Sequence, residues 1–501
     1  MNQLLLRGFK PDPSICKAGQ DYYMVTSSFE FFPSLPIYHS RDLVNWKPIG
    51  FCLDRDSQTN LVNVGNSQGM FAPTIRYNNG KFYLVCTNVG GGGNFLVTTT
   101  DPKKGWSEPI WLTDWPGIDP SLYFEENRTF IHGTRGWDRD EESGIYLAEI
   151  DLETGKLISE RKNVWSGTGA TDPEGPHLYK KDDWYYLLIS EGGTEFGHML
   201  TVARSREIFG PYESFEGNPI LTNRSLKNPI QAVGHGDLVE DDLGNWQMVF
   251  LAFRCIGYPR QHNLGRETFV TSVDWNEEEW PIISEKNSFE LYETEEAMLC
   301  DTEQYEFIEE FNKSQLHPYW YFLRRKVKEN YQLKDGQLYL RGTMGNLNDS
   351  QDVSFLGIPI TEYSFYSETT ISLKQPSRIE QGISVYVRDD YHYDLFIETK
   401  NNQKMIGLRR RIGNINQEIL VQEYEEQSIT LFVAGATENY QFGYIDSYGE
   451  KHDIFEGLTR LLSTEVTGGF IGTMIGIYVT TPEETKMNEG VFDSFNYQVK
   501  K

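Results

Sequence analysis

Short apolar runs, each preceded by a segment of proline, glycine and small polar residues, recur along the N-terminal part of the chain. The runs are rich in residues that pack on a pleated, buried surface, which predicts β-strands. The preceding segments begin at positions 12, 73, 119, 174 and 235, and each strand opens about ten residues further on. The predicted strands are 22–25, 81–85, 129–131, 184–189 and 246–251.

These five similar units predict a five-bladed β-propeller. Their starts are separated by 61, 46, 55 and 61 residues. Repeats of roughly 40 to 50 residues with several short strands each are typical of propellers, and the longer spacings leave room for loops. Five blades around one axis would bring the opening residues of all inner strands together at one end. Asp12, Asp119 and Glu174 would then meet, although they lie far apart in the sequence.

Glu174 lies in a rigid stretch directly ahead of one of these strands. Pro173 and Pro176 flank it, and each removes a backbone donor and prevents a continuous helix. Glu174 is therefore expected at the mouth of a strand. Three carboxylates in one cleft repel one another, which raises the pKa of at least one of them. Such a cluster can supply a protonated acid and an ionised base together.

The rest of the chain predicts a second all-β domain. No long helical pattern stands out, and a chain of 501 residues exceeds the size at which a single core stops growing. Short strand patterns such as 337–341 and 382–387 continue to the end and favour a β-sandwich. Because an acidic passage precedes them, we expect a propeller over residues 1–303 and a sandwich over residues 304–501.

The net charge and the cysteine content limit the classes of partner and the cellular compartment that the sequence indicates. The formal charge is 46 − 73 = −27, which argues against nucleic acid or an anionic membrane as partner, whereas a neutral ligand fits. The five cysteines form no CxxC pair, and neither a signal-peptide core nor an apolar run of roughly 18 residues is present. We therefore expect a cytoplasmic protein with free thiols. The sequence leaves open whether the chain forms a homo-oligomer.

Three motifs in the same order resemble glycoside hydrolase family 43, the five-bladed propeller glycosidases that act on xylan and arabinan side groups. The first is the run 8–15 followed by YHSRDLVNW at 38–46, the second is GIDPSL at 117–122, and the third is PEGPHLY at 173–179. Each motif alone would be weak evidence, but the ordered set is specific. The sandwich, with its closing segment 492–497, resembles the C-terminal domain of two-domain members.

The resemblance assigns a role to each carboxylate. It implies that Asp12 is the general base, that Glu174 is the general acid, and that Asp119 orients the acid and modulates its pKa. Inverting hydrolysis needs an acid and a base roughly 6.5–9.5 Å apart on opposite faces of the sugar. Read singly, Asp12 and Asp119 would instead be turn residues that cap their own backbone. Their alignment with the five-unit repeat favours the catalytic interpretation.

The resemblance also implies substrate contacts from Phe31, Phe71, His198, His235 and Arg266. His235 would lie in the central channel, where some members hold a structural calcium ion, but a buried core histidine is an equally good interpretation. Arg266 could instead pair with a surface acid. The two phenylalanines would otherwise be assigned to the core. No cofactor is expected for catalysis itself.

The implied function is an exo-acting, inverting glycosidase of arabinose- or xylose-containing oligosaccharides. Phe71 stands where the β-xylosidase branch of the family carries tryptophan, which favours an α-L-arabinofuranosidase acting on fragments of arabinoxylan or arabinan. A β-D-xylosidase or a bifunctional enzyme is the alternative. A carbohydrate-binding propeller without catalysis is disfavoured, because all three carboxylates are present. An endo-acting arabinanase is disfavoured as well, because those enzymes resemble the propeller without this sandwich.

Overall fold

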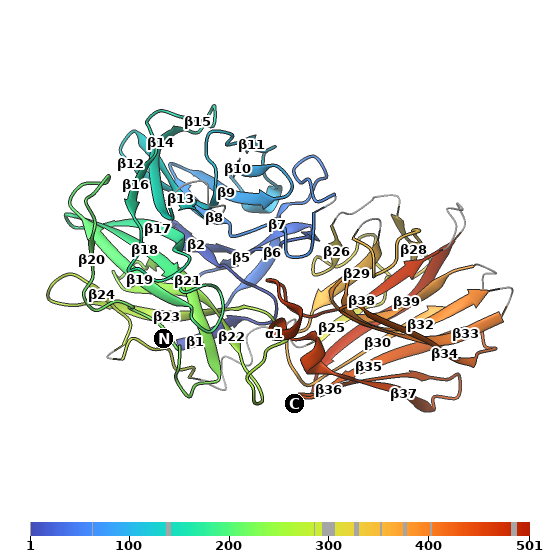
Figure 1. Ribbon diagram of the computed structural model, residues 1–501. Coiled ribbons are helices and arrows are strands. Elements are labelled where there is room, and N and C mark those ends of the chain that lie inside the picture. Colours follow the sequence, from blue (N-terminus) through green and yellow to red (C-terminus); the bar gives the residue numbers. More distant parts are fainter. Residues whose placement is uncertain are drawn as a thin grey trace.

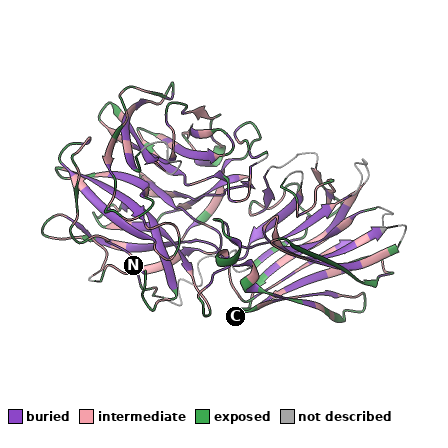
Figure 2. Ribbon diagram, viewed as in Figure 1, coloured by how far each residue is buried: buried purple, intermediate pink, exposed green. Residues whose placement is uncertain are grey.

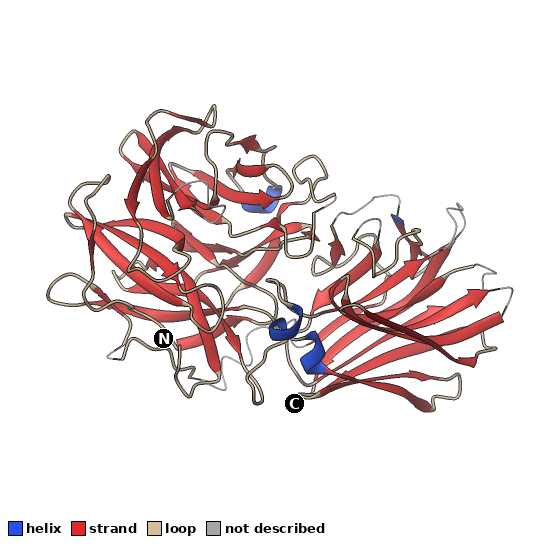
Figure 3. Ribbon diagram, viewed as in Figure 1, coloured by secondary structure: helices blue, strands red, loops and turns tan. Residues whose placement is uncertain are grey.

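The protein is built almost entirely from β-strands, as the computed structural model in Figures 1 and 3 shows. The structure describes residues 2–62, 64–136, 142–284, 286–292, 306–324, 330–350, 353–373, 378–400, 403–481 and 488–500. Within these ranges the helical elements are η1 (Pro102–Lys104), η4 (Thr459–Leu462) and α1 (Thr464–Thr467). None of the helices in these ranges has the length and apolar character needed to cross a bilayer. The all-β prediction is confirmed.

Five antiparallel sheets form the blades of the propeller. The first blade has, from the axis outward, β2 (Ser14–Ala18), β3 (Asp21–Val25), β5 (Ser34–Ser40) and β6 (Lys47–Leu53). The second has β8 (Thr74–Asn78) and β7 (Gly69–Met70) on β9 (Lys81–Val89), then β10 (Gly93–Thr99) and β11 (Ile110–Trp111). The third has β12 (Ile118–Glu125), β13 (Arg128–Arg135) and β14 (Gly144–Asp151), on which β15 (Lys156–Leu157) and β16 (Lys162–Trp165) pair.

The last two blades complete the circle. The fourth has β17 (Glu174–Lys181), β18 (Trp184–Glu191), β19 (Met199–Ser205) and β20 (Glu213–Ser214). The fifth has β21 (Ile230–Glu240), β22 (Trp246–Arg254) and β23 (Glu267–Trp275), with β24 (Pro281–Ile282) and the N-terminal β1 (Asn2–Leu6) on β23. Because β1 is the outer strand of a blade that is otherwise C-terminal in the domain, it ties the start of the chain to the end of the propeller.

The inner strands form a closed ring. β2 contacts β8, β8 contacts β12, β12 contacts β17, β17 contacts β21, and β21 contacts β2. The five strands predicted from the repeat are the second strands of the blades, β3, β9, β13, β18 and β22. A separate cluster of buried apolar side chains fills each interface between neighbouring blades. The ring is deeply buried (Figure 2), and β21 is buried over ten of its eleven residues.

The C-terminal domain is a sandwich of two eight-stranded sheets. One sheet contains β27 (Tyr331–Lys334), β28 (Gln337–Arg341), β39 (Glu489–Val499), β30 (Phe365–Ser372), β35 (Ser428–Gly435), β36 (Asn439–Ile445) and β37 (Lys451–Leu458), with β25 (Glu306–Glu309) on β39. The other contains β34 (Ile415–Glu423), β33 (Gln403–Ile412), β32 (Tyr391–Lys400), β31 (Glu380–Arg388), β38 (Met474–Thr480), β29 (Ser354–Pro359), β26 (Tyr321–Leu323) and β4 (Phe31–Phe32).

One strand belongs to both domains. β4 lies within the propeller sequence but pairs with β26 at the edge of the sandwich sheet. Phe31 is fully buried there and contacts Phe9 and Tyr321 edge to face. A partly buried ion pair also crosses the junction, since Arg254 of β22 contacts Glu362 of the sandwich at 2.8 Å. The predicted boundary between residues 303 and 304 lies outside the described residues.

We expect a chain truncated after residue 292 to aggregate. Truncation removes β26, which exposes the free edge of β4 and the apolar ring of Phe31, and exposed apolar patches of this kind promote association. Size-exclusion chromatography with light scattering checks the oligomeric state against the intact chain. Replacing Phe31 with Ser in the truncated chain should raise its monomeric fraction. A monomeric truncated chain with the thermal midpoint of the intact protein would contradict this expectation.

Candidate active site

The three predicted carboxylates meet where the inner strands of three blades begin. Asp12 lies two residues before β2, Asp119 is the second residue of β12, and Glu174 is the first residue of β17. Asp12 and Asp119 adopt left-handed backbone angles, with φ of 54° and 52°. This conformation is uncommon for residues other than glycine and clusters at functional sites. The ladders of β12 and β17 also shift register beside Asp119 and Glu174.

Asp119 is buried between the other two carboxylates. Burial is the largest cause that raises the pKa of Asp119 well above its usual range, and the negative charges of Glu174 and Asp12 raise this pKa further. A hydrogen bond of 3.0 Å from the Gly175 backbone N–H to Asp119 Oδ2 opposes the shift. Because its partner lies 56 residues away, Asp119 is not a local turn cap.

Asp12 is held by side chains from two distant segments. Arg266 Nη1 donates to Asp12 Oδ1 at 2.8 Å, and Ser27 Oγ donates to Asp12 Oδ2 at 2.5 Å. His235 Nδ1 lies 3.8 Å from the same Oδ1. Arg266 also donates to Thr194 Oγ1 and to the backbone oxygen of Phe470. Arg266 therefore pairs with a deeply buried acid and not with a surface acid, which was the alternative in the sequence analysis.

Glu174 is the most exposed of the three carboxylates, with a side-chain exposure of 20%. His198 Nε2 lies 3.4 Å from Glu174 Oε1, and His198 Nδ1 is 3.2 Å from the carbonyl oxygen of Ala232. Two glycines make room for this arrangement. A Cβ on Gly175 would come within 2.9 Å of the His235 ring, and a Cβ on Gly234 would come within 2.1 Å of the His198 ring. β17 and β21 can therefore approach these two histidine rings only because residues 175 and 234 have no side chain.

An aromatic wall stands beside Arg266, but its members differ from those predicted. Phe71 packs 5.2 Å from Phe29, and both contact Phe470 of the sandwich, with ring centroids 5.9 and 5.8 Å away. The guanidinium of Arg266 lies over the rings of Phe29 and Phe470. Phe31 is a core residue of the domain junction, which leaves it no free face for a sugar ring. Phe29 is buried as well, so Phe71 and Phe470 are the members of this wall that keep an accessible face.

A pocket of about 460 Å³ opens beside this wall, between the propeller and the sandwich. Its lining combines aromatic faces with a few polar groups, which is the usual make-up of a small-molecule site. Arg266 Nε and His198 Nε2 are buried nearby without a hydrogen-bond partner among the described residues. The lining residues are Thr194, Glu195, Phe196, Phe253, His262, Gly265, Arg266, Thr464, Glu465, Gly469, Phe470 and Ile471.

The surroundings of His235 do not fit a calcium ion held by protein ligands. Calcium takes six to eight oxygen ligands at 2.3–2.6 Å. Among the described residues Asp12 offers the one carboxylate oxygen within 4.0 Å of the His235 ring nitrogens, and Arg266 already donates to that oxygen. Burial lowers the pKa of His235, although Asp12 and Glu174 oppose the shift. The histidine is therefore a buried neutral side chain facing Asp12.

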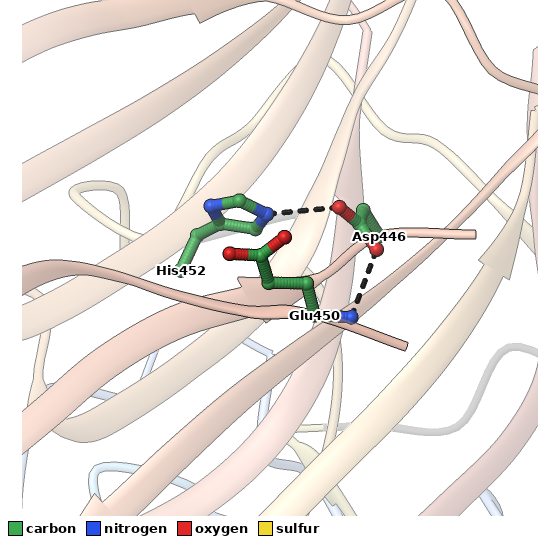
Figure 4. A group of neighbouring side chains, drawn as sticks. All are labelled: Asp446, Glu450 and His452. Atoms are coloured by element: carbon green, nitrogen blue, oxygen red, sulfur yellow. Dashed lines mark hydrogen bonds and ion pairs between the residues drawn. The ribbon is translucent and has the colours of Figure 1, made fainter. Parts of the chain in front are cut away.

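A group of metal-ligating side chains does occur elsewhere in the described chain, at the β36–β37 turn (Figure 4). Asp446, Glu450 and His452 have ligand atoms within 4.8 Å of one another. Asp446 Oδ1 accepts the N–H groups of Tyr448 and Glu450, and Asp446 Oδ2 lies 2.9 Å from His452 Nε2. The hydrogen bond to His452 is the first cause that lowers the pKa of Asp446. This group is explained as the cap of a hairpin turn.

The family model "Glycosyl hydrolases family 43" matches residues 2–281, and the model "Beta xylosidase C-terminal Concanavalin A-like domain" matches residues 308–498. The chain belongs to glycosyl hydrolase family 43. It is therefore a glycosidase, and the propeller followed by a sandwich is the arrangement that these two models describe. The resemblance drawn from the three sequence motifs is confirmed.

Relatives within the family share nearly the whole chain. A non-reducing end alpha-L-arabinofuranosidase of Bacteroides ovatus is 34% identical over 99% of this chain and 94% of its own length. A xylosidase/arabinosidase of Butyrivibrio fibrisolvens is 36% identical over 97% of both chains. Among solved structures, a xylan beta-1,4-xylosidase of Bacillus halodurans superposes with a TM-score of 0.89, at 30% identity over 99% of both chains. This family 43 glycosidase thus resembles enzymes named for both sugars.

Sequence reasoning missed four residues of the site. Ser27 and Phe29 stand in the run after the first motif, where the resemblance drew attention to Phe31 instead. Thr194 and Phe470 meet Arg266 only in the folded chain, and Phe470 lies 204 residues away from it. No local pattern marks Phe470, because a single aromatic residue after two glycines is common in turns.

We expect Asp119→Asn to stabilise the glycosidase and to reduce its activity. Asparagine keeps an oxygen for the Gly175 N–H but removes a buried negative charge next to two others. The activity should then fall off at a lower pH on the basic side, because the proton on the acid loses a neighbouring charge that retains it. Differential scanning calorimetry and the pH profile of kcat/KM check the two effects. A lower thermal midpoint or a profile shifted to higher pH would contradict the role of Asp119.

Proposed function

We propose that this glycosidase releases single terminal α-L-arabinofuranosyl residues, with inversion, from oligosaccharides derived from arabinoxylan or arabinan. The observation that carries the proposal is the set of three carboxylates in three different environments at one end of the propeller axis. One carboxylate is held by donors, one is buried beside two other charges, and one is partly exposed. These are the environments that a base, a modulator and an acid require.

We assign the general acid to Glu174. Its side chain is the most accessible of the three, so it can reach the oxygen of the leaving group. A carbonyl oxygen only accepts hydrogen bonds, so His198 Nδ1 carries the proton in its contact with Ala232. In this tautomer the lone pair of Nε2 is directed toward Glu174, so it can accept a hydrogen bond from the general acid when the acid carries its proton. Contacts of this kind are often long without substrate and tighten when substrate binds.

We assign the general base to Asp12. Arg266 and Ser27 donate to its two oxygens and fix its orientation, and each oxygen retains a second lone pair that can accept a proton from water. In an inverting mechanism this water attacks the anomeric carbon from the face opposite Glu174. Asp119 holds the N–H of Gly175, the residue after Glu174, so it orients the acid through the backbone.

The pocket supports action on a terminal sugar. Phe470 of the sandwich lines the pocket beside Arg266, which contacts Asp12, and Phe29 and Phe71 of the propeller pack against Phe470. Aromatic faces suit the apolar face of one sugar ring. The buried Arg266 Nε, which has no hydrogen-bond partner among the described residues, is suited to bind a hydroxyl group of that ring.

The sugar preference is supported by Phe71 and by the nearly full-length similarity to an arabinofuranosidase. The alternative is a β-D-xylosidase, or an enzyme with both activities, which the similarity to a xylan beta-1,4-xylosidase favours. The two sugars offer similar hydroxyl groups. One apolar contact distinguishes such ligands by only about 1–3 kcal/mol.

Glu174→Ala and Asp12→Ala should differ in their response to the leaving group. Glu174→Ala should slow oligosaccharides far more than activated aryl glycosides, because only the former need protonation. Asp12→Ala should slow both, by about 10²–10⁴-fold, because water activation is common to all substrates. Initial rates on both substrate types check this. Asp172→Asn, an exposed neighbour on the same loop, is the matched control. Equal, small losses in the two alanine variants would refute the assignment.

Proton NMR of the first-formed sugar tests the role of Asp12 in the same experiment. Cleavage of an α-L-arabinofuranoside should yield the β-anomer first, since water attacks from the opposite face. Retained configuration would mean that a carboxylate attacks the sugar itself, which requires carboxyl groups only about 5–5.5 Å apart. Glu174 would keep its role in either case, whereas Asp12 would become a nucleophile.

The wild-type enzyme should have a larger kcat/KM on p-nitrophenyl α-L-arabinofuranoside than on p-nitrophenyl β-D-xyloside. Phe71→Trp should move the ratio toward the xyloside, by about 10–200-fold if one apolar contact decides it. Initial-rate measurements on the two aryl glycosides check both statements. A larger value on the xyloside for the wild type would reverse the sugar assignment and leave the carboxylate roles unchanged.

A further inference from the structure

A buried ion pair occupies the propeller axis just beyond the carboxylates. Arg76 of β8 and Asp237 of β21 form two hydrogen bonds, of 2.8 Å from Nη1 to Oδ2 and 3.1 Å from Nη2 to Oδ1. Asp237 is fully buried, and Arg76 has a side-chain exposure of 15%. A two-point contact between guanidinium and carboxylate fixes both the distance and the orientation of its partners.

The first, second and fifth blades meet directly at this pair. Ser14 Oγ and the Ile15 N–H of β2 donate to Asp237 Oδ2 at 2.7 and 3.0 Å. Ser14 Oγ also accepts the N–H of Ile75 at 3.1 Å, which joins β2 to β8. Each of these hydrogen bonds crosses between blades, so the ion pair connects strands that share no sheet.

The third and fourth blades join through His177 and Tyr179. Arg76 Nη2 lies 2.9 Å from His177 Nδ1 of β17, and Ser121 Oγ of β12 lies 3.1 Å from the same nitrogen. Arginine can only donate, so His177 Nδ1 accepts and the proton of the neutral ring is on Nε2. Tyr179 OH donates to Asp237 Oδ1 at 2.5 Å. The network therefore reaches all five inner strands.

The members of the network stand just downstream of the site residues on the same strands. Ser14 follows Asp12 by two residues, Ser121 follows Asp119 by two, His177 follows Glu174 by three, and Asp237 follows His235 by two. Between the members of the last three pairs the sheet register shifts, and Asp12, Asp119 and His235 have left-handed backbone angles. Each site residue is thus attached to the network through a short, conformationally restricted segment.

We propose that Arg76 is a positioning residue, which holds the four inner-strand segments that carry Asp12, Asp119, Glu174 and His235 at fixed separations and takes the place of a channel cation. The proposal rests on the function proposed above for the carboxylates. The guanidinium supplies a fixed positive charge and a planar set of donors on the axis. A metal ion placed beside it would face a like charge.

The network keeps one charge state across the working pH range. The charge of Arg76 is the main effect that lowers the pKa of Asp237, against the effect of burial, to well below its usual range. Burial lowers the pKa of His177 to about 3. Asp237 is therefore ionised and His177 is neutral near neutral pH. The separations that the network sets do not change with pH.

Three variants test the proposal. Arg76→Lys keeps the charge but loses the two-point contact, and Arg76→Met loses both. Because Arg76→Met leaves Asp237 as a lone buried charge, the double variant Arg76→Met, Asp237→Asn provides a neutral axis for a chain that folds. Arg409→Met is the matched control, since Arg409 is a buried arginine that pairs with two carboxylates, Glu380 and Asp394, inside the sandwich and away from the axis.

We expect the double variant to lose about 10²-fold in kcat, the effect of misplacing reacting groups by roughly 1 Å, with KM changed far less. Arg76→Lys should lie between the double variant and the wild type. Arg409→Met should lower the thermal midpoint without lowering the kcat of the folded enzyme. A chelator should leave the wild-type rate unchanged. The rates are measured on whichever aryl glycoside the wild type cleaves faster.

A second readout does not depend on catalysis. In histidine-labelled protein, the NMR signals of His177, His198 and His235 should shift or broaden in the double variant, and those of the sandwich histidines should not. Unchanged signals together with a kcat within about threefold of wild type would overturn the proposal. An equal kcat loss in Arg409→Met would also overturn it, and so would a wild-type rate that falls on chelation. If the wild type cleaves neither glycoside, the proposed function fails, and the histidine signals still test the network.

Discussion

Closure of the five inner strands into one ring is the constraint on which the rest of the structure depends. The ring brings the first residues of β12 and β17 and the segment before β2 to one point, and each carries a carboxylate. Like charges at close range oppose folding, and after burial this repulsion is the second cause that raises the pKa of Asp119. The ring is maintained by the apolar packing between blades and by β1, which completes the fifth blade. The stability of the scaffold thus permits a cluster that would otherwise drive its own strands apart.

How much of this the sequence predicts depends on whether a feature is local. The second strand of each blade and the rigid segment around Glu174 follow from proline, glycine and β-branched residues that are close together in the chain. The convergence of Asp12, Asp119 and Glu174 follows from the repeat, because the axis is a consequence of symmetry. Phe470 could not be predicted in this way, since its place beside Arg266 is set by how the sandwich docks.

The same reasoning explains why Phe31 belongs to the domain junction and does not line the site. Both phenylalanines stand in one short run, and alternation alone sends them to the same face of a strand. The left-handed backbone angle of Phe29 breaks that alternation. Phe31 enters the sheet shared with β26, and Phe29 packs against Phe71 and Phe470. The pairing partner of Phe31 is Leu323, 292 residues further along the chain, so the local sequence could not show that this ring belongs to the domain junction.

The charged groups around the propeller axis suit glycoside cleavage, and the net charge of the chain does not show this. Four acids lie there, Asp12, Asp119, Glu174 and Asp237, with two arginines, Arg76 and Arg266. With one proton held within the Asp119 and Glu174 pair, three negative charges face two positive ones. Glycoside cleavage passes through an oxocarbenium-like state with positive charge on the sugar, and a fixed negative field stabilises it without reorganisation. A neutral sugar gains little from this field, so the arrangement favours the transition state over the substrate. In the proposed mechanism, the proton that relieves the repulsion in the resting site is also the proton that the acid transfers to the leaving group.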